Sequence, residues 1–438
     1  MLAYLDHQAS TPCDPAVVAA MAPWWSEHPA NASSRGHRPG LEAAAAVERA
    51  RAQVATALGA SPEWVVFTSG ATEANNLALK GVAEAALGEP GGLQASRRRL
   101  LSLVSEHRAV LDPLHYLERH GFPLTLLPVG GDGRLDPAAL AAALGDDVLL
   151  VSAMAANNEI GVLQPLAALA ALCRARGALL HVDAAQAAGH LPLAMEKLGI
   201  DLLSLSGHKC GGPKGVGALL VRPGLELAPQ LHGGGQEGGR RAGSVAVPLV
   251  VGLGEALALA TARQEAEARR LAALRDRLWA GLEAVGAISL NGPPPGPDRL
   301  AHNLNVTVHG VDGAALHQRL RRRLAVSSGS ACSQGSPSHV LAALGRSRAE
   351  AAASIRFGLG ATTTAAEIAL AIAVVTQAVG ELRRCQAGGP PLRSGQVSAS
   401  CKQWHSARQV SPACSSTRPC VTAGPPSAAP PGRSCCSP

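Results

Sequence analysis

Short apolar runs alternate with longer, alanine-rich amphipathic stretches from about residue 15 to about residue 251. This alternation is typical of strands and helices layered on a largely parallel sheet. The pattern predicts helices between seven strands at residues 64–68, 100–104, 124–127, 148–153, 179–183, 202–205 and 216–221. We therefore expect an α/β fold in which a mostly parallel seven-stranded sheet lies between layers of helices.

A charged, alanine-rich stretch at residues 256–285 has helical periodicity, and we expect it to connect this body to a second unit. The second unit is predicted to be α+β, with a strand at 303–308, a helix at 313–323, a loop rich in serine and glycine, a strand at 354–359 and a final helix. The domains expected are a large one at residues 15–255 and a small one formed by residues 1–14 and 256–385.

Residues 386–438 differ in composition, being rich in Pro, Ser, Gly, Ala and Cys without apolar periodicity. Such a segment cannot bury enough apolar surface to offset the entropy lost on ordering, so we expect it to be disordered. It carries five of the ten cysteines but no Cys-x-x-Cys pair, and the other five are scattered. Free thiols are therefore expected rather than disulfides or a metal site.

Charge and composition exclude several classes of protein. The formal net charge is +7, but residues 386–438 contribute five basic residues and no acidic ones, which leaves +2 for residues 1–385. Nucleic-acid binding predicts clustered basic residues interleaved with aromatics, and aromatic residues make up only 2% of the chain. We find no signal-peptide pattern and no apolar run long enough to cross a bilayer, so a cytoplasmic protein with no membrane partner is expected.

The first segment that indicates chemistry is Phe67-Thr-Ser-Gly-Ala-Thr-Glu-Ala-Asn-Asn76, where an apolar strand ends and a helix begins. Small residues such as Ala71 allow backbone amides and the Thr72 hydroxyl to bind an anion at the helix N-terminus. An ordinary capped helix explains this motif equally well when it is taken alone.

Asp183 and Lys209 follow two successive predicted strands, at the sheet edge where α/β proteins bind ligands. A carboxylate there can keep a pyridine nitrogen protonated, and a lysine desolvated in a glycine-rich loop can form a Schiff base. Ser206 and His208 flank the lysine as candidate phosphate ligands. A helix-capping Asp and a solvated Lys are the alternatives, but the two together favour a pyridoxal 5'-phosphate (PLP) site.

His107 follows the predicted strand at 100–104 and so lies at the same edge. Its flat imidazole can stack on a cofactor ring and exchange protons near neutral pH, although a structural histidine is also compatible with the pattern. Cys332 lies in the loop 326–339 among small polar residues, which indicates an accessible nucleophile rather than a buried thiol. Arg356 lies in a short apolar strand, where a bidentate carboxylate partner is expected.

With these segments in place, the chain resembles the cysteine desulfurase family, a PLP-dependent branch of the fold-type I, class V aminotransferase enzymes. The resemblance extends from residue 4 to about residue 382. It is carried by segments in family order at residues 68–73, 106–107, 157–161, 181–186, 206–209, 233–237 and 327–332.

The resemblance implies a role for each candidate. Lys209 would carry PLP as a Schiff base, Asp183 would pair with the pyridine nitrogen, and Gln186 would touch the ring hydroxyl. His107 would stack on the ring and shuttle protons. The phosphate would be held by Ala71, Thr72, Ser206 and His208, and the substrate by Asn158, Arg356, which clamps its carboxylate, and Asn31.

The reaction implied by the resemblance is the removal of sulfur from L-cysteine, giving L-alanine and a persulfide on Cys332. The sulfur would pass to an acceptor such as an iron–sulfur scaffold protein or a thiolation pathway. Ser244 falls where the family usually has a Thr that reaches the phosphate of the neighbouring subunit, which implies a homodimer with shared active sites. No metal is implied.

The sequence also departs from the family pattern. Ala32 replaces the usual Pro after Asn31, which alters a turn near the substrate entrance. Ala361 stands where many members have Arg, so a contact on the small domain is lost. The loop after Cys332 is shorter than the commonest form, which bears on sulfur delivery to partners.

Other functions are compatible with parts of the pattern. An aminotransferase or a selenocysteine lyase shares the PLP residues, but an aminotransferase has no need of Cys332 and the lyase needs less from it. A non-catalytic scaffold for sulfur-carrier or iron–sulfur assembly proteins would keep the fold without the chemistry. The presence of every expected catalytic residue argues against a scaffold.

Overall fold

The structure is a computed structural model that describes residues 2–88, 97–328 and 338–386. The chain divides into two units, Met1–Pro390 and Pro391–Pro438, and all of the second unit lies outside the described residues. The predicted disorder of residues 386–438 therefore concerns a segment of which only Gln386 is described.

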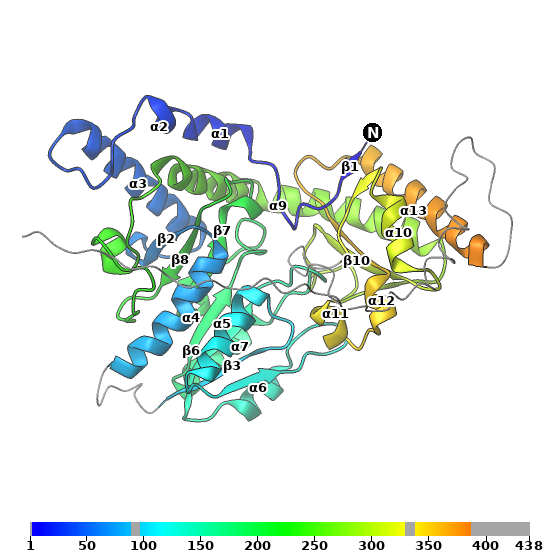
Figure 1. The fold of residues 1–438 in the computed structure, drawn as a ribbon, viewed down its shortest axis with the longest axis horizontal. Helices are drawn as coiled ribbons and strands as arrows, with labels where there is room; N and C mark the ends of the chain where they lie inside the picture. Colours follow the sequence, from blue (N-terminus) through cyan, green and yellow to red (C-terminus); the bar gives the residue numbers. More distant parts are fainter. Residues whose placement is uncertain (1, 89–96, 329–337, 387–438) are drawn as a thin grey trace, which may run out of the picture. The chain divides into compact units, whose positions relative to one another are not determined.

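The largest sheet of the first unit has seven strands (Figure 1). In spatial order they are β2 (Val65–Thr68), β8 (Gly217–Val221), β7 (Leu202–Ser206), β6 (Leu179–Asp183), β5 (Val148–Met154), β3 (Arg99–Leu103) and β4 (Leu124–Leu127). The last five strands of this order are parallel, whereas β8 is antiparallel to both of its neighbours. The predicted α/β fold is confirmed, and every predicted strand of this sheet overlaps an observed one.

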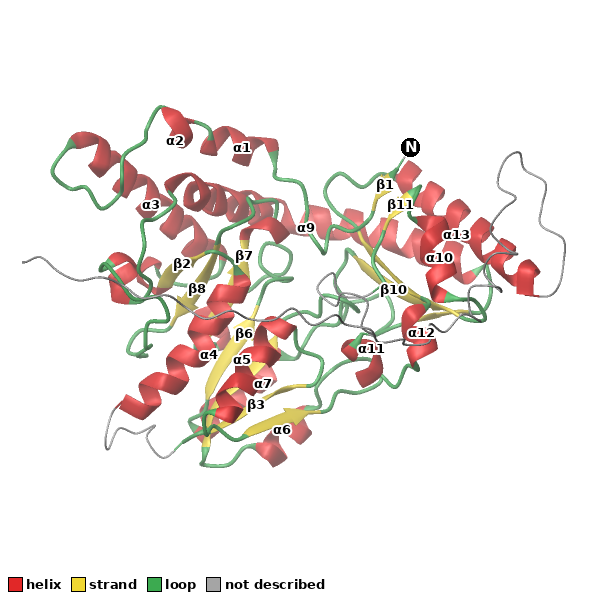
Figure 2. Ribbon diagram, viewed as in Figure 1, coloured by secondary structure: helices red, strands yellow, loops and turns green. Residues whose placement is uncertain are grey.

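Helices cover both faces of this sheet (Figure 2). Leu100 packs with α4 (Ala71–Gly88) and α5 (Arg108–Arg119) on one face, and its neighbour Leu101 packs into the core on the other face. Because both faces are covered, the strands are continuous apolar runs, and each fully buried leucine contributes about 1.5–3 kcal/mol. The layers of helices thus explain why the strands were recognisable in the sequence.

The helix α9 (Val247–Glu283) runs from the core of the large sheet to that of the small sheet. Its residue Val250 is buried in the first core, where α9 packs against α3 (Arg38–Ala57), and Leu278 is buried in the second. The predicted helix at 256–285 began too late, because the first residues of α9 are apolar and lack the charged positions that marked the rest.

The second core lies around two smaller sheets. The antiparallel sheet has the order β12 (Ser354–Gly358), β10 (Asn303–Val308) and β9 (Ile288–Leu290), and the parallel pair joins β1 (Ala3–Tyr4) to β11 (Leu324–Ala325). The helix predicted at 313–323 ends at Leu320, as α10 (Gly313–Leu320), because the chain turns there into β11. The N-terminal segment therefore packs with the small-sheet core.

The C-terminal helix of the described chain is α13 (Ala365–Gln386). By length and composition it alone among the described helices could cross a membrane, which the sequence analysis did not anticipate. Its residues Ile368, Val375 and Val379 are buried in the small-sheet core, where α13 packs against α9 and α10. This packing is that of a core helix.

The remaining described elements are short. They are α1 (Pro15–Met21), α2 (Pro23–Ser26), α6 (Pro137–Ala143), α7 (Leu166–Arg176), α8 (Met195–Leu198), α11 (His339–Ala343), α12 (Arg348–Ala352) and the 3-10 turns Pro62–Trp64, Gly207–Lys209 and Gln236–Gly239.

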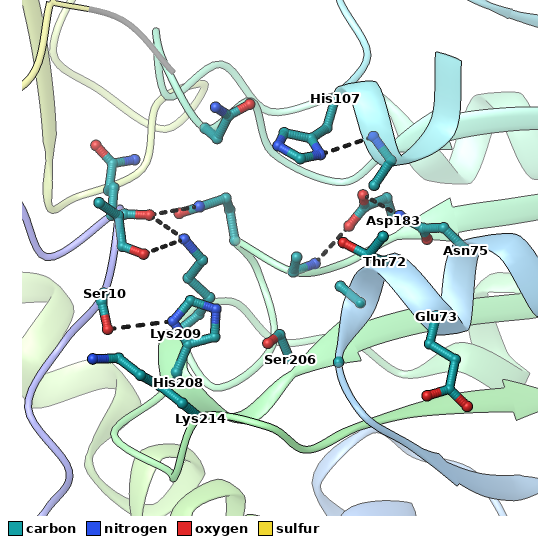
Figure 3. A pocket seen from close by; sticks show the side chains of 18 of the residues that line it. Ser10, Thr72, Glu73, Asn75, His107, Asp183, Ser206, His208, Lys209 and Lys214 are labelled. Carbon is teal, nitrogen blue, oxygen red and sulfur yellow. Dashed lines mark hydrogen bonds between the residues drawn. The ribbon is translucent and has the colours of Figure 1, made fainter. Parts of the chain in front are cut away.

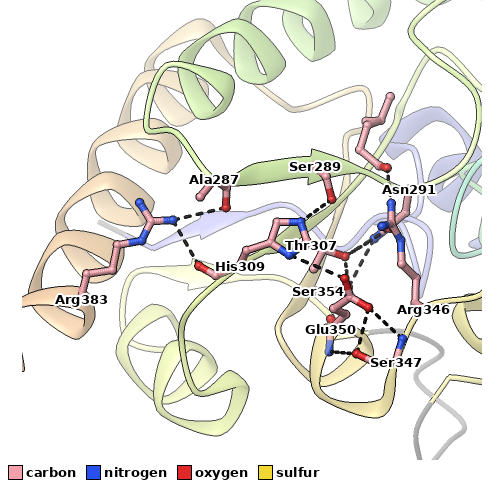
Figure 4. Close-up of polar contacts among 11 residues, drawn as sticks. Ala287, Ser289, Asn291, Thr307, His309, Arg346, Ser347, Glu350, Ser354 and Arg383 are labelled. Atoms are coloured by element: carbon pink, nitrogen blue, oxygen red, sulfur yellow. Dashed lines mark hydrogen bonds and ion pairs between the residues drawn. The ribbon is translucent and has the colours of Figure 1, made fainter. Parts of the chain in front are cut away.

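Buried polar side chains connect the strands of the three-stranded sheet (Figure 4). Asn291 donates to Thr307 Oγ1 at 2.9 Å, and the Thr307 and Ser354 hydroxyls lie 2.8 Å apart. Arg346 Nε donates to Asn291 Oδ1 at 2.8 Å. Because buried polar groups are costly when unpaired, this network specifies the register of β10 with β12, the strand that carries Arg356.

Candidate active site

A cavity of about 500 Å³ lies at the carboxyl ends of the parallel strands (Figure 3). Met154, Asp183 and Ser206 line it from the last positions of β5, β6 and β7. The structure brings ten of the predicted site residues to this cavity, namely Ala71, Thr72, His107, Asn158, Asp183, Gln186, Ser206, His208, Lys209 and Arg356.

The carboxylate of Asp183 is 6% exposed and is held by two donors. Asn75 Nδ2 donates to Oδ2 and the backbone N–H of Ala185 donates to Oδ1, each at 2.9 Å. Hydrogen bonds to an anionic acceptor are stronger than those between neutral groups, so the pair fixes the orientation of the carboxylate at the cavity wall.

A second carboxyl group, that of Glu106, is fully buried nearby. Burial raises the pKa of Glu106 well above its usual value, and the negative charge of Asp183 raises it further. Its Oε1 accepts a hydrogen bond from the Met154 backbone at 2.6 Å, and its Oε2 has no partner among the described residues. Both effects favour a neutral Glu106, so the negative charge at this wall comes from Asp183.

The amine of Lys209 lies in the same cavity, at the end of the 3-10 turn that follows β7. Its Nζ donates to the backbone carbonyl of Gln8 and, at 2.9 Å, to that of Ala9. The N-terminal segment therefore reaches across to the lysine and forms part of the cavity wall.

One part of the cavity lining is suited to an anion. The helix α4 (Ala71–Gly88) begins there, so its positive dipole end and the Thr72 hydroxyl lie beside Ser206. Burial lowers the pKa of His208 to about 4, with the nearby lysine charges adding to the effect. His208 is therefore a neutral hydrogen-bonding group at pH 7, and Lys214 supplies positive charge to the same wall.

His107 caps the N-terminus of α5. Its Nδ1 accepts a hydrogen bond from the backbone N–H of Ala109 at 3.1 Å. Burial lowers the pKa of His107, an effect that the Asp183 charge partly offsets. Because Nδ1 is occupied as an acceptor, the neutral ring carries its proton on Nε2.

Arg356 is almost fully buried in β12, at 1% exposure. Its Nη1 donates to the backbone carbonyl of Asn158 at 3.0 Å and its Nη2 to Oδ1 of Asp6 at 2.7 Å. Its Nε is buried and has no hydrogen-bond partner among the described residues. The carboxylate partner in the structure is Asp6, which bonds through one guanidinium nitrogen instead of forming the bidentate pair expected from the sequence.

Two predicted residues lie outside the lining of this cavity. Asn31 Nδ2 approaches Ser244 Oγ at 3.5 Å, and Ser244 lines a second cavity of about 120 Å³ with Glu237 and Arg241. The two residues therefore contact each other, while the main cavity is lined by other side chains.

Cys332 lies outside the described residues, within the gap at 329–337. The described residues on both sides of the gap bond to the site. The Ser327 hydroxyl accepts from Arg356 Nη2 at 3.1 Å, and His339 Nε2 donates to the Glu106 carbonyl at 2.8 Å.

Sequence reasoning did not assign roles to Asp6, Gln8 or Asn75, all of which shape this site. The Gln8 carbonyl accepts from both Lys209 and Gln186, the latter at 3.1 Å. Asn75 could have been found, because it lies three positions after Thr72 and so shares its helix face. The sequence held no comparable signal for Asp6 and Gln8, whose positions depend on the path of the N-terminal segment.

Comparison with known proteins places the chain in a family. The class V aminotransferase family model matches residues 3–370. Cysteine desulfurase IscS of Dechloromonas aromatica is 44% identical over 405 residues, covering 92% of this chain and 98% of the relative. Cysteine desulfurase IscS of Methylococcus capsulatus is 46% identical over 384 residues, covering 87% of this chain and 93% of the relative. A solved structure described as a NifS-like protein is 34% identical with a TM-score of 0.80, covering 87% of this chain and 100% of that one.

The chain therefore belongs to the class V aminotransferase family. Within this family it is a cysteine desulfurase, an enzyme that takes sulfur from L-cysteine and passes it to acceptors, and its cofactor is PLP.

The described cavity fits this cofactor. PLP has an aldehyde, a pyridine nitrogen and a phosphate, and the cavity presents the Lys209 amine, the Asp183 carboxylate and the N-terminal end of α4 with Thr72. The backbone is compact just before α4 begins, where a Cβ on Gly217 would come 2.7 Å from Cα of Gly70. The donor set and the small residues thus suit all three parts of the cofactor.

Proposed function

We propose that Lys209 is the residue that binds PLP covalently and that Asp183 is the partner of its pyridine nitrogen. The observation that carries this assignment is that both side chains line one cavity from the ends of neighbouring strands. Gln186 lies against the ring hydroxyl, and the phosphate is held by Ala71, Thr72, Ser206 and His208. When bound, PLP supplies the electron sink that stabilises negative charge on the substrate carbon atoms.

The substrate carboxylate is bound by Arg356 and oriented by Asn158. The Nε of Arg356, which has no hydrogen-bond partner among the described residues, provides a donor, and hydrogen bonds between a guanidinium and a carboxylate are stronger than those between neutral groups. Asn31 lies outside the cavity lining, so its proposed contribution is at the substrate entrance. His107 stacks on the ring and moves the substrate Cα proton through Nε2, with its Nδ1 held by the Ala109 backbone.

Cys332 accepts the sulfur. Its thiolate attacks the sulfur atom of bound L-cysteine, so that an S–S bond forms and the Cβ–S bond breaks. The electron pair of the broken bond remains on the substrate Cβ, which takes up a proton, and the products are L-alanine and a persulfide on Cys332. The sulfur then passes to an acceptor such as an iron–sulfur scaffold protein or a thiolation partner.

Contacts on both sides of Cys332 support this assignment. Ser327 bonds to Arg356, and His339 bonds to the backbone beside His107. Five residues of extended chain span at most roughly 18 Å, which keeps Cys332 within reach of the cavity from Ser327. The segment that carries the thiol is thus tethered to the substrate-binding residues at one end and to the proton-transfer residue at the other.

The assembly and location are also proposals. Ser244 lies outside the main cavity of its own chain. In a homodimer, this side chain would reach the phosphate of the neighbouring subunit. We propose a cytoplasmic location and a division into a large domain at 15–255 and a small domain at 1–14 with 256–385. Separate apolar cores around the large and small sheets support the division.

Turnover of L-cysteine by variants in which one cysteine is replaced by serine tests the role of Cys332. Cys332→Ser is expected to abolish formation of L-alanine while keeping the visible absorption of bound PLP. Cys385→Ser is the matched control, because Cys385 lies on α13 at intermediate exposure and outside the cavity lining. Unchanged turnover in Cys332→Ser would rule out the assignment.

A further inference from the structure

Arg356 has one carboxylate partner among the described residues, and that partner comes from the other end of the chain. Asp6 Oδ1 accepts from Arg356 Nη2 at 2.7 Å, and the two side chains are 21% and 2% exposed. The guanidinium is therefore removed from water, while the carboxylate lies at the edge of the buried region. A buried cation depends strongly on such a partner, since its charge is otherwise uncompensated.

A hydroxyl completes the pair. Ser327 Oγ donates to Asp6 Oδ1 at 2.9 Å and accepts from Arg356 Nη2 at 3.1 Å. Both hydrogens of Nη2 are thereby engaged, and one of the two hydrogens of Nη1 is engaged by the Asn158 carbonyl. These contacts fix the plane of the guanidinium and leave the buried Nε as the donor without a protein partner among the described residues.

Backbone pairing places Asp6 at this position. The N–H of Gly358 in β12 donates to the Leu5 carbonyl at 2.8 Å, and the N–H of His7 donates to the Gly358 carbonyl at 3.1 Å. On the same strand Arg356 exchanges backbone hydrogen bonds with Ser327. Asp6, Ser327 and Arg356 are therefore held in register by the main chain, and their contact does not depend on the chance meeting of flexible side chains.

We propose that Asp6, assisted by Ser327, is a positioning residue for substrate recognition, which holds the Arg356 guanidinium in the plane that selects amino acids with a free α-carboxylate. This inference rests on the proposed role of Arg356 as the carboxylate clamp. Asp6 itself acts through Arg356. Its negative charge compensates the buried guanidinium before substrate binds, and its fixed geometry limits the rotamers open to the long side chain, so less entropy is lost on binding.

Contacts on the other side of β12 also hold Arg356 in place, as this positioning role requires. The strand β12 is fixed on its other side by β10, where Asn305 pairs with Arg356, and by the buried hydroxyl pair of Thr307 and Ser354 (Figure 4). The Arg356 backbone therefore lies between β10 and the segment that carries Ser327, and its side chain is held by Asp6 and Ser327.

Two ligands that differ only in the carboxylate give a direct test. S-methyl-L-cysteine and 2-(methylthio)ethylamine have no thiol to transfer, and the second lacks the carboxylate. Their dissociation constants are measured on the PLP-loaded enzyme from the change in visible absorption. We expect Asp6→Asn to weaken S-methyl-L-cysteine by about 10-fold or more and to change 2-(methylthio)ethylamine by less than about 2-fold.

The matched control is Asp14→Asn. Asp14 lies in the same N-terminal segment and pairs with Arg263 at 2.7 Å on the surface, outside the cavity lining, and Asn can still cap α1. Both dissociation constants should be unchanged in this variant. A loss of affinity for both ligands in Asp6→Asn would indicate a general disturbance of the site and overturn the proposal.

The variant Arg356→Gln distinguishes the role of Arg356 from that of Asp6. If Arg356→Gln leaves the preference for the carboxylate ligand intact, the clamp itself is misassigned. If Arg356→Gln abolishes the preference but Asp6→Asn keeps it, the clamp stands and the role of Asp6 is refuted. Should Asp6→Asn fail to fold or to retain PLP, Ser327→Ala is measured instead. If the Ser327 hydroxyl positions the guanidinium, this variant must lower the preference for the ligand with a carboxylate. An unchanged preference would reject the proposal.

Discussion

The amide nitrogen of Asn75 lies 2.9 Å from Oδ2 of Asp183, and both side chains are buried. Asn75 belongs to α4, the helix whose N-terminal end is proposed to hold the phosphate, and Asp183 ends the strand β6. One hydrogen bond therefore links the element that suits the phosphate to the carboxylate that suits the pyridine nitrogen.

Replacing Asn75 should weaken PLP binding. Asn75→Ala removes a donor from the buried Asp183 carboxylate, and the loss of a hydrogen bond to a charged group costs about 1.5–3 kcal/mol. We expect the dissociation constant of PLP to rise by about 10-fold or more, measured by equilibrium dialysis. Asn76→Ala is the control, because Asn76 bonds to the Thr72 backbone instead. Equal effects of the two variants would contradict the role of Asn75.

Lys209→Ala should abolish covalent attachment of the cofactor. After borohydride reduction, mass spectrometry of the intact wild-type enzyme should show one PLP fixed per chain, and the variant should show none. Lys214→Ala serves as control, because Lys214 is the other lysine in the lining of the same cavity and is not proposed to bind PLP covalently. Fixation of PLP in Lys209→Ala, or its loss in Lys214→Ala alone, would move the assignment to the other lysine.

Gly217 has no room for a side chain. It pairs with Thr68 of β2 and Ser206 of β7, and an added Cβ would lie 2.3 Å from the Leu205 carbonyl oxygen. Gly217→Ala should lower the free energy of unfolding by about 1–3 kcal/mol or more, because the strands must separate to admit the methyl group. Gly131→Ala, at a position with no atoms within 4 Å of the new Cβ, should be close to neutral in the same thermal-unfolding measurement. Equal melting temperatures for the two variants would refute the steric account.

The buried His181 should make the enzyme less stable in acid. It lies between the hydroxyls of Ser152 at 2.8 Å and Ser204 at 3.0 Å, and burial lowers its pKa to about 4 from 6.5. Between these two pH values the unfolded chain binds a proton that the folded chain does not. Stability therefore falls as the pH falls from 6.5 towards 4, by up to about 3 kcal/mol, and is constant above that window as far as this group is concerned.

The measurement is the melting temperature as a function of pH for His181→Asn and for the wild type. The variant should be less stable at pH 7.5 but should lose less between pH 6.5 and 4, because the group that drives the difference in proton binding is gone. His28→Asn, at an exposed position, should keep the wild-type slope. A wild-type slope in His181→Asn would show that other groups dominate the acid response.

The large sheet could be predicted from the sequence because its strands are buried on both faces. β5, for example, is buried at all seven positions, and its apolar run was located to within one residue at its end. The start of α9 was missed for the related reason that Val247 and Val250 are buried on a helix without charged neighbours. Runs without polar positions mark burial well but do not distinguish where a helix begins.

The sequence predicted those site residues that directly follow a recognisable strand. Asp183 and Lys209 follow recognisable strands, so the sheet itself brought them together at one edge. Asp6 could not be placed in the same way, since its contact with Arg356 joins residues 350 positions apart and depends on the N-terminal segment lying beside β12. Long-range pairs of this kind leave no periodic signal in the sequence.

The destination of the sulfur tests the account most directly. The enzyme is incubated with L-cysteine labelled with ³⁵S and freed of excess substrate, persulfides are alkylated, and the labelled peptide is identified by mass spectrometry. We expect label on the peptide that contains Cys332, released by a thiol reductant, and none on peptides that contain Cys13 or Cys385. Label on either of these cysteines with none on Cys332 would contradict it.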